Sequence, residues 1–184
     1  TTGLFTAVLE VGGPHTISAS NGGVSGSATI RINGAPRMLN NASANPNPVT
    51  GTTTALSARG DDDDELEGGD GGEGNLTYTW SVVGTPPGPV TFSANGTNGA
   101  KDTIATFVKA GSYDIHVVLE DRLGRGLVGD VVVNVSQTAT LMVLGPATAT
   151  VPSNSTQQFT ATVNDQFGDA LVTQPAINWN VNGG

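Results

Sequence analysis

Cysteine is absent from the 184-residue chain, and charged residues make up only 12% of it. The absence of cysteine excludes a disulfide scaffold and a thiolate metal site. Aromatic residues amount to 5%, and no apolar run approaches the roughly 20 residues of a membrane-spanning helix. The 7 Lys and Arg residues stand against 16 Asp and Glu, which is opposite to the basic faces that bind nucleic acid. We therefore expect no membrane span and no nucleic-acid partner.

Small neutral side chains carry most of the polarity. The chain has 24 Thr, 12 Ser, 15 Asn and 26 Gly residues. Thr suits the pleated surface of a strand, whereas Gly and Asn suit turns. Apolar and polar residues alternate through most of the sequence, with no convincing helical period. This pattern predicts an all-β fold.

The middle of the chain, residues 35–137, predicts one complete sandwich. Trp80 lies where the core Trp of strand C is expected, and Tyr113 lies where a tyrosine corner opens strand F. Clusters of Gly, Pro, Asn and Asp separate the alternating segments. The expected strands are 53–58, 76–82, 90–94, 103–108, 113–120 and 128–135.

The C-terminal flank, residues 138–184, predicts the opening half of another sandwich. Trp179 would take the strand C position, and Phe159 alternates into the same core. Three strands cannot bury a core by themselves, so this half needs a partner. The expected strands are 141–144, 157–163 and 177–181.

The N-terminal flank, residues 1–34, predicts a closing half with strands at 4–9, 15–19 and 27–32. The flanks of 34 and 47 residues sum to one small sandwich. We therefore expect tandem immunoglobulin-like β-sandwiches, one complete and one split between the two chain ends, with residues 1–34 of the next unit completing 138–184. The apolar residues expected at this assembly surface are Leu4, Phe5, Ile17 and Ile30.

Both flanks carry motifs of a known family. The opening half has Gln-Gln-Phe-Thr-Ala-Thr at 157–162, then Asp-Gln-Phe-Gly at 165–168 and Trp179. The closing half has Gly-Leu-Phe-Thr-Ala at 3–7 and Gly-Ser-Ala-Thr-Ile at 26–30. These motifs resemble bacterial Ig-like (Big-type) repeats.

The middle domain resembles PKD-like and cadherin-like surface domains, through Asn-Leu-Thr-Tyr-Thr-Trp at 75–80, Ala-Gly-Ser-Tyr at 110–113 and Leu-Glu-Asp at 119–121. Such families serve as spacers, stalks and adhesins in large secreted bacterial proteins. The resemblance therefore implies an extracellular or cell-surface structural protein that is not an enzyme. Its expected partners are copies of itself, and also cell-surface glycans or other surface proteins.

Three arrangements would complete the two half-sandwiches. The chain is one unit of a covalent tandem array, or separate chains join head to tail by strand complementation, or the two halves of one chain meet in a permuted two-domain monomer. We favour the first two, because short linkers would have to span a domain about 40 Å long for the halves to meet. The expected function is therefore a unit of a filament, stalk or adhesin.

Eight of the sixteen acidic residues lie between positions 61 and 73. A Gly-rich acidic loop can supply the six to eight oxygens that Ca²⁺ prefers, and Asp121 would approach from the same end of the sandwich. The spacing does not fit an EF-hand, so the alternatives are a looser calcium site or a solvated, unpacked loop. The candidate ligands are Asp61, Asp62, Asp63, Asp64, Glu65, Glu67, Asp70, Glu73 and Asp121.

A carbohydrate-binding or calcium-dependent adhesive module, folded as a permuted monomer, is the alternative function. Sugar-binding sandwiches generally expose aromatic rings, whereas Trp80, Trp179 and Tyr113 are expected in cores. No pattern of catalytic residues emerges, and the freedom of the acidic loop is opposite to a preorganised active site.

Overall fold

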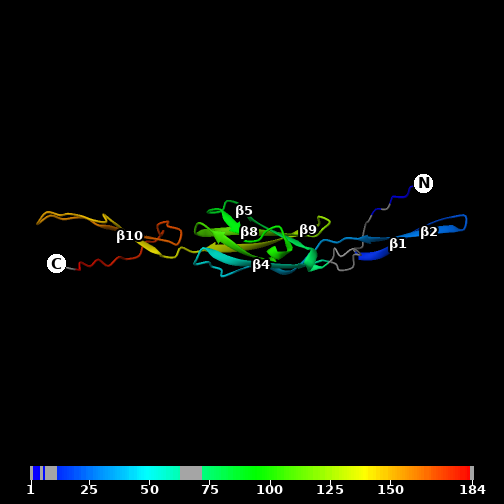
Figure 1. Cartoon of the computed structure of the whole chain (residues 1–184), viewed down its shortest axis with the longest axis horizontal. Coiled ribbons are helices and arrows are strands. Elements are labelled where there is room, and N and C mark those ends of the chain that lie inside the picture. Colours follow the sequence, from blue (N-terminus) through cyan, green and yellow to red (C-terminus); the bar gives the residue numbers. More distant parts are fainter. Residues whose placement is uncertain (1, 5, 7–11, 63–71, 183–184) are drawn as a thin grey trace.

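The computed structural model is all-β, with several separate sheets (Figure 1). It describes residues 2–4, 6, 12–62 and 72–182. The strands are β1 (Gly12–Asn21), β2 (Val24–Ile32), β3 (Arg37–Asn45), β4 (Thr53–Asp61), β5 (Thr77–Val83), β6 (Val90–Phe92), β7 (Asp102–Phe107), β8 (Gly111–Glu120), β9 (Gly126–Val135), β10 (Leu141–Gly145) and β11 (Thr160–Asn164). Two short 3₁₀ turns are η1 (Glu73–Asn75) and η2 (Asn98–Lys101). Among the described residues, no helix is long and apolar enough to cross a bilayer.

Strands β3 to β9 form a two-layered sandwich in the middle of the molecule (Figure 1). One sheet has the order β3-β4-β7-β6 and the other has the order β5-β8-β9, with antiparallel neighbours throughout. Alternate residues of each strand point to the same face, so the apolar–polar alternation gives each sheet one apolar face. On β8 the buried residues are Tyr113, Ile115, Val117 and Leu119.

Two aromatic residues of this core also have hydrogen-bonded polar atoms. Trp80 is 2% exposed and donates from Nε1 to the carbonyl oxygen of Ala100 at 2.7 Å. Tyr113 is fully buried and donates from its hydroxyl to the carbonyl oxygen of Lys109 at 2.8 Å. Each of these two large rings is therefore buried with its polar hydrogen paired.

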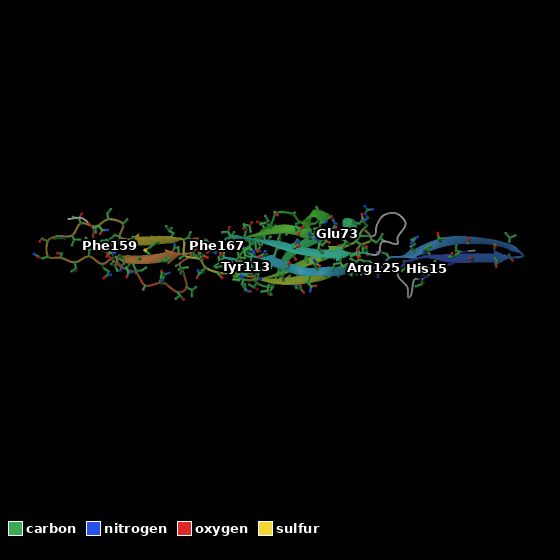
Figure 2. The ribbon with its side chains drawn as sticks, turned by 90° about the horizontal axis from the view of Figure 1, so that it is seen from below. His15, Glu73, Tyr113, Arg125, Phe159 and Phe167 are labelled. Carbon is green, nitrogen blue, oxygen red and sulfur yellow. The ribbon has the colours of Figure 1, made fainter. Side chains whose placement is uncertain are left out.

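One two-stranded hairpin extends from each end of the sandwich, β1–β2 on one side and β10–β11 on the other (Figure 1). His15 and Phe159, one in each flank, lie on opposite sides of the sandwich in Figure 2. Within the described residues each hairpin is a sheet of its own and pairs with no other strand.

The β1–β2 hairpin has two unlike faces, because residues directly opposite each other share a face. The apolar face is built from the pairs His15–Ile30, Ile17–Ala28, Ala19–Gly26 and Asn21–Val24. The other face, called the hydroxyl face below, is built from the pairs Thr16–Thr29, Ser18–Ser27 and Ser20–Ser25.

Several expected strands differ from the structure. Strand β11 begins at Thr160 rather than at residue 157, and residues 177–181 form no strand. Backbone groups of a strand need a neighbour, and none pairs with this segment among the described residues. Most of the segment 4–9 lies outside the described residues, and residues 4 and 6 are not in a strand.

Strand β3 was not expected from the sequence. Three of its nine residues are Asn, which is depleted in strands. The segment forms a strand because β4 offers it a pairing edge, and the register is irregular between Met38 and Ser43. Its polar composition fits this position at the edge of the four-stranded sheet.

Candidate functional site

A buried carboxylate holds the linker that enters the sandwich. Asp121 directly follows β8 and is 6% exposed. Its Oδ1 accepts hydrogen bonds from the backbone N–H groups of Leu123 at 2.8 Å and Arg125 at 2.9 Å. Its Oδ2 accepts one from Nδ2 of Asn33 at 2.6 Å, and Arg125 donates from Nη1 to the carbonyl oxygen of Asn33 at 2.8 Å. Asn33 lies between β2 and β3, so this turn fastens the N-terminal linker to the sandwich.

A second buried carboxylate holds the linker that leaves the sandwich. Asp165 directly follows β11 and is 2% exposed. Its Oδ1 accepts hydrogen bonds from the backbone N–H groups of Phe167 at 2.9 Å and Asp169 at 3.0 Å. Its Oδ2 accepts one from Nε2 of Gln137 at 2.9 Å. Gln137 lies between β9 and β10. At both junctions, therefore, the aspartate Oδ1 accepts from two backbone N–H groups of its own turn and the Oδ2 accepts from a linker amide.

We call these two turns the linker clamps. Both have the sequence Asp-x-apolar-Gly-x. In each, the Asp backbone N–H donates to the carbonyl oxygen four residues later, at 2.9 Å for Asp121 and 2.8 Å for Asp165. Gly124 and Gly168 have φ of 79° and 88°, a region that costs other residues energy. Each clamp therefore combines a preformed turn with an amide side chain from the adjoining linker.

The C-terminal clamp also contacts the end of the sandwich directly. Phe167 packs against the apolar core of the sandwich. Gln166 donates from Nε2 to the carbonyl oxygens of Ser136 at 2.8 Å and Gly51 at 3.1 Å. Its Oε1 accepts a hydrogen bond from the backbone N–H of Thr138 at 2.8 Å. One turn thus joins the end of the sandwich, the linker and the start of the flank. Phe167 of this turn is labelled in Figure 2, between the sandwich and Phe159.

The charge of Asp165 is stabilised where it lies. Burial by itself would raise the pKa of this carboxyl group, because burial disfavours the charged form. The hydrogen bonds from Gln137 and from the turn N–H groups outweigh burial, so the pKa of Asp165 lies below its ordinary value. An ionised acceptor makes stronger hydrogen bonds than a neutral one. The C-terminal clamp is therefore fully formed at neutral pH.

The candidate calcium ligands are distributed unevenly in the structure. Oδ2 of Asp61 accepts a hydrogen bond from Nη2 of Arg37. Oε2 of Glu73 accepts one from Nζ of Lys101 at 2.8 Å. Asp121 belongs to a linker clamp. Asp62 is buried. The remaining candidates lie outside the described residues: Asp63, Asp64, Glu65, Glu67 and Asp70.

The described acids make no metal site by themselves. In the part of the chain that the structure describes, no group of three or more His, Asp or Glu side chains could hold a metal ion. Lysine and backbone donors occupy the oxygens of Glu73 and Asp121 that calcium would need. A calcium site in the segment 61–73 stays a prediction from the sequence.

The two aromatic residues assigned to a C-terminal core are exposed within this chain. Trp179 is 54% exposed and Phe159 is 38% exposed. With Leu144 and Val181 they line a hollow of about 580 Å³, together with Asn180 and Asn182. Among the described residues, β10 and β11 pair only with each other, and the β1–β2 hairpin lies on the far side of the sandwich (Figure 1).

The predicted assembly residues are in the N-terminal flank. Ile17 and Ile30 lie on the apolar face of the β1–β2 hairpin, and Ile17 is exposed. Leu4 is 97% exposed, and Phe5 lies outside the described residues. The structure therefore places an open apolar surface in each flank.

Comparison with known proteins adds little to this geometry. No protein-family model and no curated protein matches the chain. Among solved structures it is similar to a nucleoside hydrolase-related hypothetical protein from Saccharophagus degradans that is associated with carbohydrate metabolism, at 22% identity and a TM-score of 0.42. The match covers 58% of this chain and 26% of that one, so the chain spans about a quarter of that protein. A likeness this distant supports no transfer of fold or activity.

Sequence reasoning missed the linker clamps. The Asp-x-apolar-Gly pattern occurs at Asp121, directly after the expected strand 113–120, and at Asp165, two residues after the end of the expected strand 157–163, and this recurrence was a usable signal. The amide partners, Asn33 and Gln137, carried no signal. They lie 88 and 28 residues away from the aspartates that they bond, and the chain has many other amides.

Proposed function

We propose that the protein is a structural repeat unit of an extracellular bacterial filament, stalk or adhesin. In this proposal residues 35–137 are a complete PKD-like sandwich. Residues 138–184 are the opening half of an Ig-like sandwich that residues 1–34 of the next unit complete. Neighbouring units are joined covalently or by strand complementation. The role is mechanical rather than catalytic, and the unit binds copies of itself.

The strand order supports the immunoglobulin-like assignment. Counted within the sandwich, strands 1, 2, 5 and 4 make one sheet and strands 3, 6 and 7 make the other. This is the order of the constant-type immunoglobulin fold. Trp80 on the third strand and the Tyr113 hydroxyl bonded to the carbonyl of Lys109 are further features of that fold.

The observation that carries the proposal is the pair of linker clamps. A spacer or stalk must keep successive domains in line, and flexible linkers would let them rotate. Here a buried aspartate fastens the linker on each side of the sandwich, through Asn33 and Gln137. The flanking hairpins consequently extend in opposite directions from the sandwich (Figure 1). This extended arrangement of a single unit supports a role in a fibre.

Light scattering coupled to size-exclusion chromatography, over a concentration series, tests the proposal on the 184-residue chain. We expect species whose mass grows with concentration, well above the 18.5 kDa of one chain. A folded monomer of constant mass at every concentration would reject joining of separate chains by strand complementation and favour the permuted two-domain monomer.

A further inference from the structure

We infer that the hollow lined by Leu144, Phe159 and Trp179 receives the β1–β2 hairpin of a second copy, in the register that β5 and β8 use inside the sandwich. The inference rests on the proposed function and specifies the contact between units. The complete sandwich supplies the template, because both flanking hairpins repeat parts of it.

The first strand of the β1–β2 hairpin has the same backbone and side-chain pattern as the first strand of the β8–β9 hairpin. Gly111 has a φ of 142° and precedes Tyr113 by two residues. Gly13 has a φ of 130° and precedes His15 by two residues. The unusual backbone and the large ring side chain therefore recur together. His15 takes the place of Tyr113.

The cross-strand pairs then follow in the same order. Val117, four residues after Tyr113, lies opposite Gly129 of β9. Ala19, four residues after His15, lies opposite Gly26 of β2. A glycine opposite a small or branched apolar residue thus occurs at the same place in both hairpins.

The β10–β11 hairpin repeats β3–β4 in a similar way. Met38 on β3 and Met142 on β10 each lie opposite a residue that is two positions before a buried aspartate, Asp62 or Asp165. The strand that follows β4 holds Trp80, and the segment that follows β11 along the chain holds Trp179. Each Trp is followed by one small polar residue and a Val.

These correspondences select the surface that fits the hollow. In the sandwich a Cβ on Gly129 would lie 2.6 Å from Cε of Met38, so the methionine occupies the space that the glycine leaves. The corresponding residues are Gly26 and Met142. In this chain nothing lies within 4 Å of a Cβ added to Gly26. Met142 of a second copy has the chemistry and the position to fill that space.

The register follows from the same template. Trp80 of β5 lies opposite Val117 of β8. Trp179 corresponds to Trp80, and Ala19 corresponds to Val117. In the same register, Trp179 of one copy therefore lies opposite Ala19 of the other, in an antiparallel pair. No strand among the described residues pairs with the backbone of residues 177–181, and this arrangement supplies its ladder hydrogen bonds.

A protein surface suits the hollow better than a sugar does. Four of its six lining residues are apolar, and the polar ones are Asn180 and Asn182. The apolar face of the β1–β2 hairpin is exposed along most of its length. Burial of two such faces against each other removes apolar area from water on both sides.

Two leucine variants test the packing. Gly26→Leu places a leucine side chain on the apolar face, where the template leaves no room, whereas Ser27→Leu places one on the hydroxyl face. Both sites are exposed in the single chain, so both variants should fold alike. We expect Gly26→Leu to raise the concentration of half-assembly by roughly tenfold or more, since overpacking of this kind is costly. We expect Ser27→Leu to leave it within about threefold of wild type, as is usual for surface substitutions.

Disulfide trapping tests the register, and the chain has no cysteine to interfere. The template sets Asn180 of one copy opposite Ser18 of the other. Chains with Ser18→Cys are mixed with chains with Asn180→Cys and oxidised. We expect a covalent dimer of the two variants. The control mixes Ser18→Cys with Asn178→Cys, which is two residues out of register and too distant for a disulfide.

The outcomes separate the inference from the proposed function. If wild type assembles while Gly26→Leu assembles equally well, or if the two cysteine mixtures cross-link alike, the inference is wrong and the repeat-unit proposal stands. If wild type is monomeric throughout and no mixture cross-links, head-to-tail joining itself is wrong. Saturable quenching of tryptophan fluorescence by oligosaccharides in a monomeric chain would assign the hollow to a sugar and overturn the inference.

Discussion

Asn33 donates a 2.6 Å hydrogen bond to Oδ2 of Asp121, a residue 88 positions further along the chain. Gln137 donates a 2.9 Å hydrogen bond to Oδ2 of Asp165 at the other end of the sandwich. A linker is thus held on each side by an amide that reaches a buried carboxylate. Loss of either amide should affect one junction and leave the sandwich intact.

Asn33→Ala is expected to loosen the N-terminal junction alone. The change removes a hydrogen bond to a charged group, of about 1.5–3 kcal/mol. The β1–β2 hairpin should then sample many orientations relative to the sandwich, which small-angle X-ray scattering would detect as a broader distribution of molecular lengths. Asn40→Ala, at an exposed position on β3, is the control and should leave the scattering unchanged. An Asn33→Ala profile identical to wild type would show that the clamp does not orient the hairpin.

Acid should open the C-terminal junction. The pKa of Asp165 is lower in the folded chain than its ordinary value, so its contribution to stability is complete above the ordinary pKa of about 3.9 and is lost as the pH falls through the folded pKa. Urea unfolding at pH 7 and at decreasing pH should therefore show a loss of stability beginning below about pH 4. Asp165→Asn should be less stable at pH 7 and less sensitive to acid. Asp169→Asn, whose carboxylate is exposed, should follow wild type.

Truncation of the two tryptophans should change the free energy of unfolding by very different amounts. Trp80→Ala empties a buried site and should cost about 3–5 kcal/mol of unfolding free energy. Trp179→Ala removes a ring that is 54% exposed and should change the stability of the single chain by less than about 0.5 kcal/mol. Chemical denaturation in dilute solution measures both. A large loss of stability in Trp179→Ala would mean that its own chain already covers this ring.

The acidic segment gives the calcium prediction. A chain that binds calcium there should melt at a higher temperature in calcium than in chelator, because ligand binding to the native state stabilises it. Replacement of Asp63 and Asp64 by Asn should remove this difference. Asp114→Asn on β8 is the control. Equal melting temperatures of wild type in calcium and in chelator would reject the metal.

The sequence predicted the all-β class because alternation is a local property. Residues such as Ile115 and Val117 alternate with polar neighbours, and the pleat alone sends them to one face. Strand β3 could not be predicted, because its Asn-rich sequence pairs only in the presence of β4. The bonds from Asn33 and Gln137 could not be predicted either. They depend on which distant residues the completed fold brings within 3 Å of a carboxylate.

The hydroxyl face of the β1–β2 hairpin has a consequence for the conditions under which units would join. Thr and Ser side chains cover most of this face, the charged Arg31 lies at the base of the hairpin, and the opposite face is mostly apolar. An interface made by such a hairpin gains little from ion pairs, so dilution or addition of salt leaves its electrostatics nearly unchanged. Its strength comes from the release of water around apolar groups, which weakens on cooling. A fibre joined in this way would be tuned by temperature rather than by salinity, and would loosen in the cold.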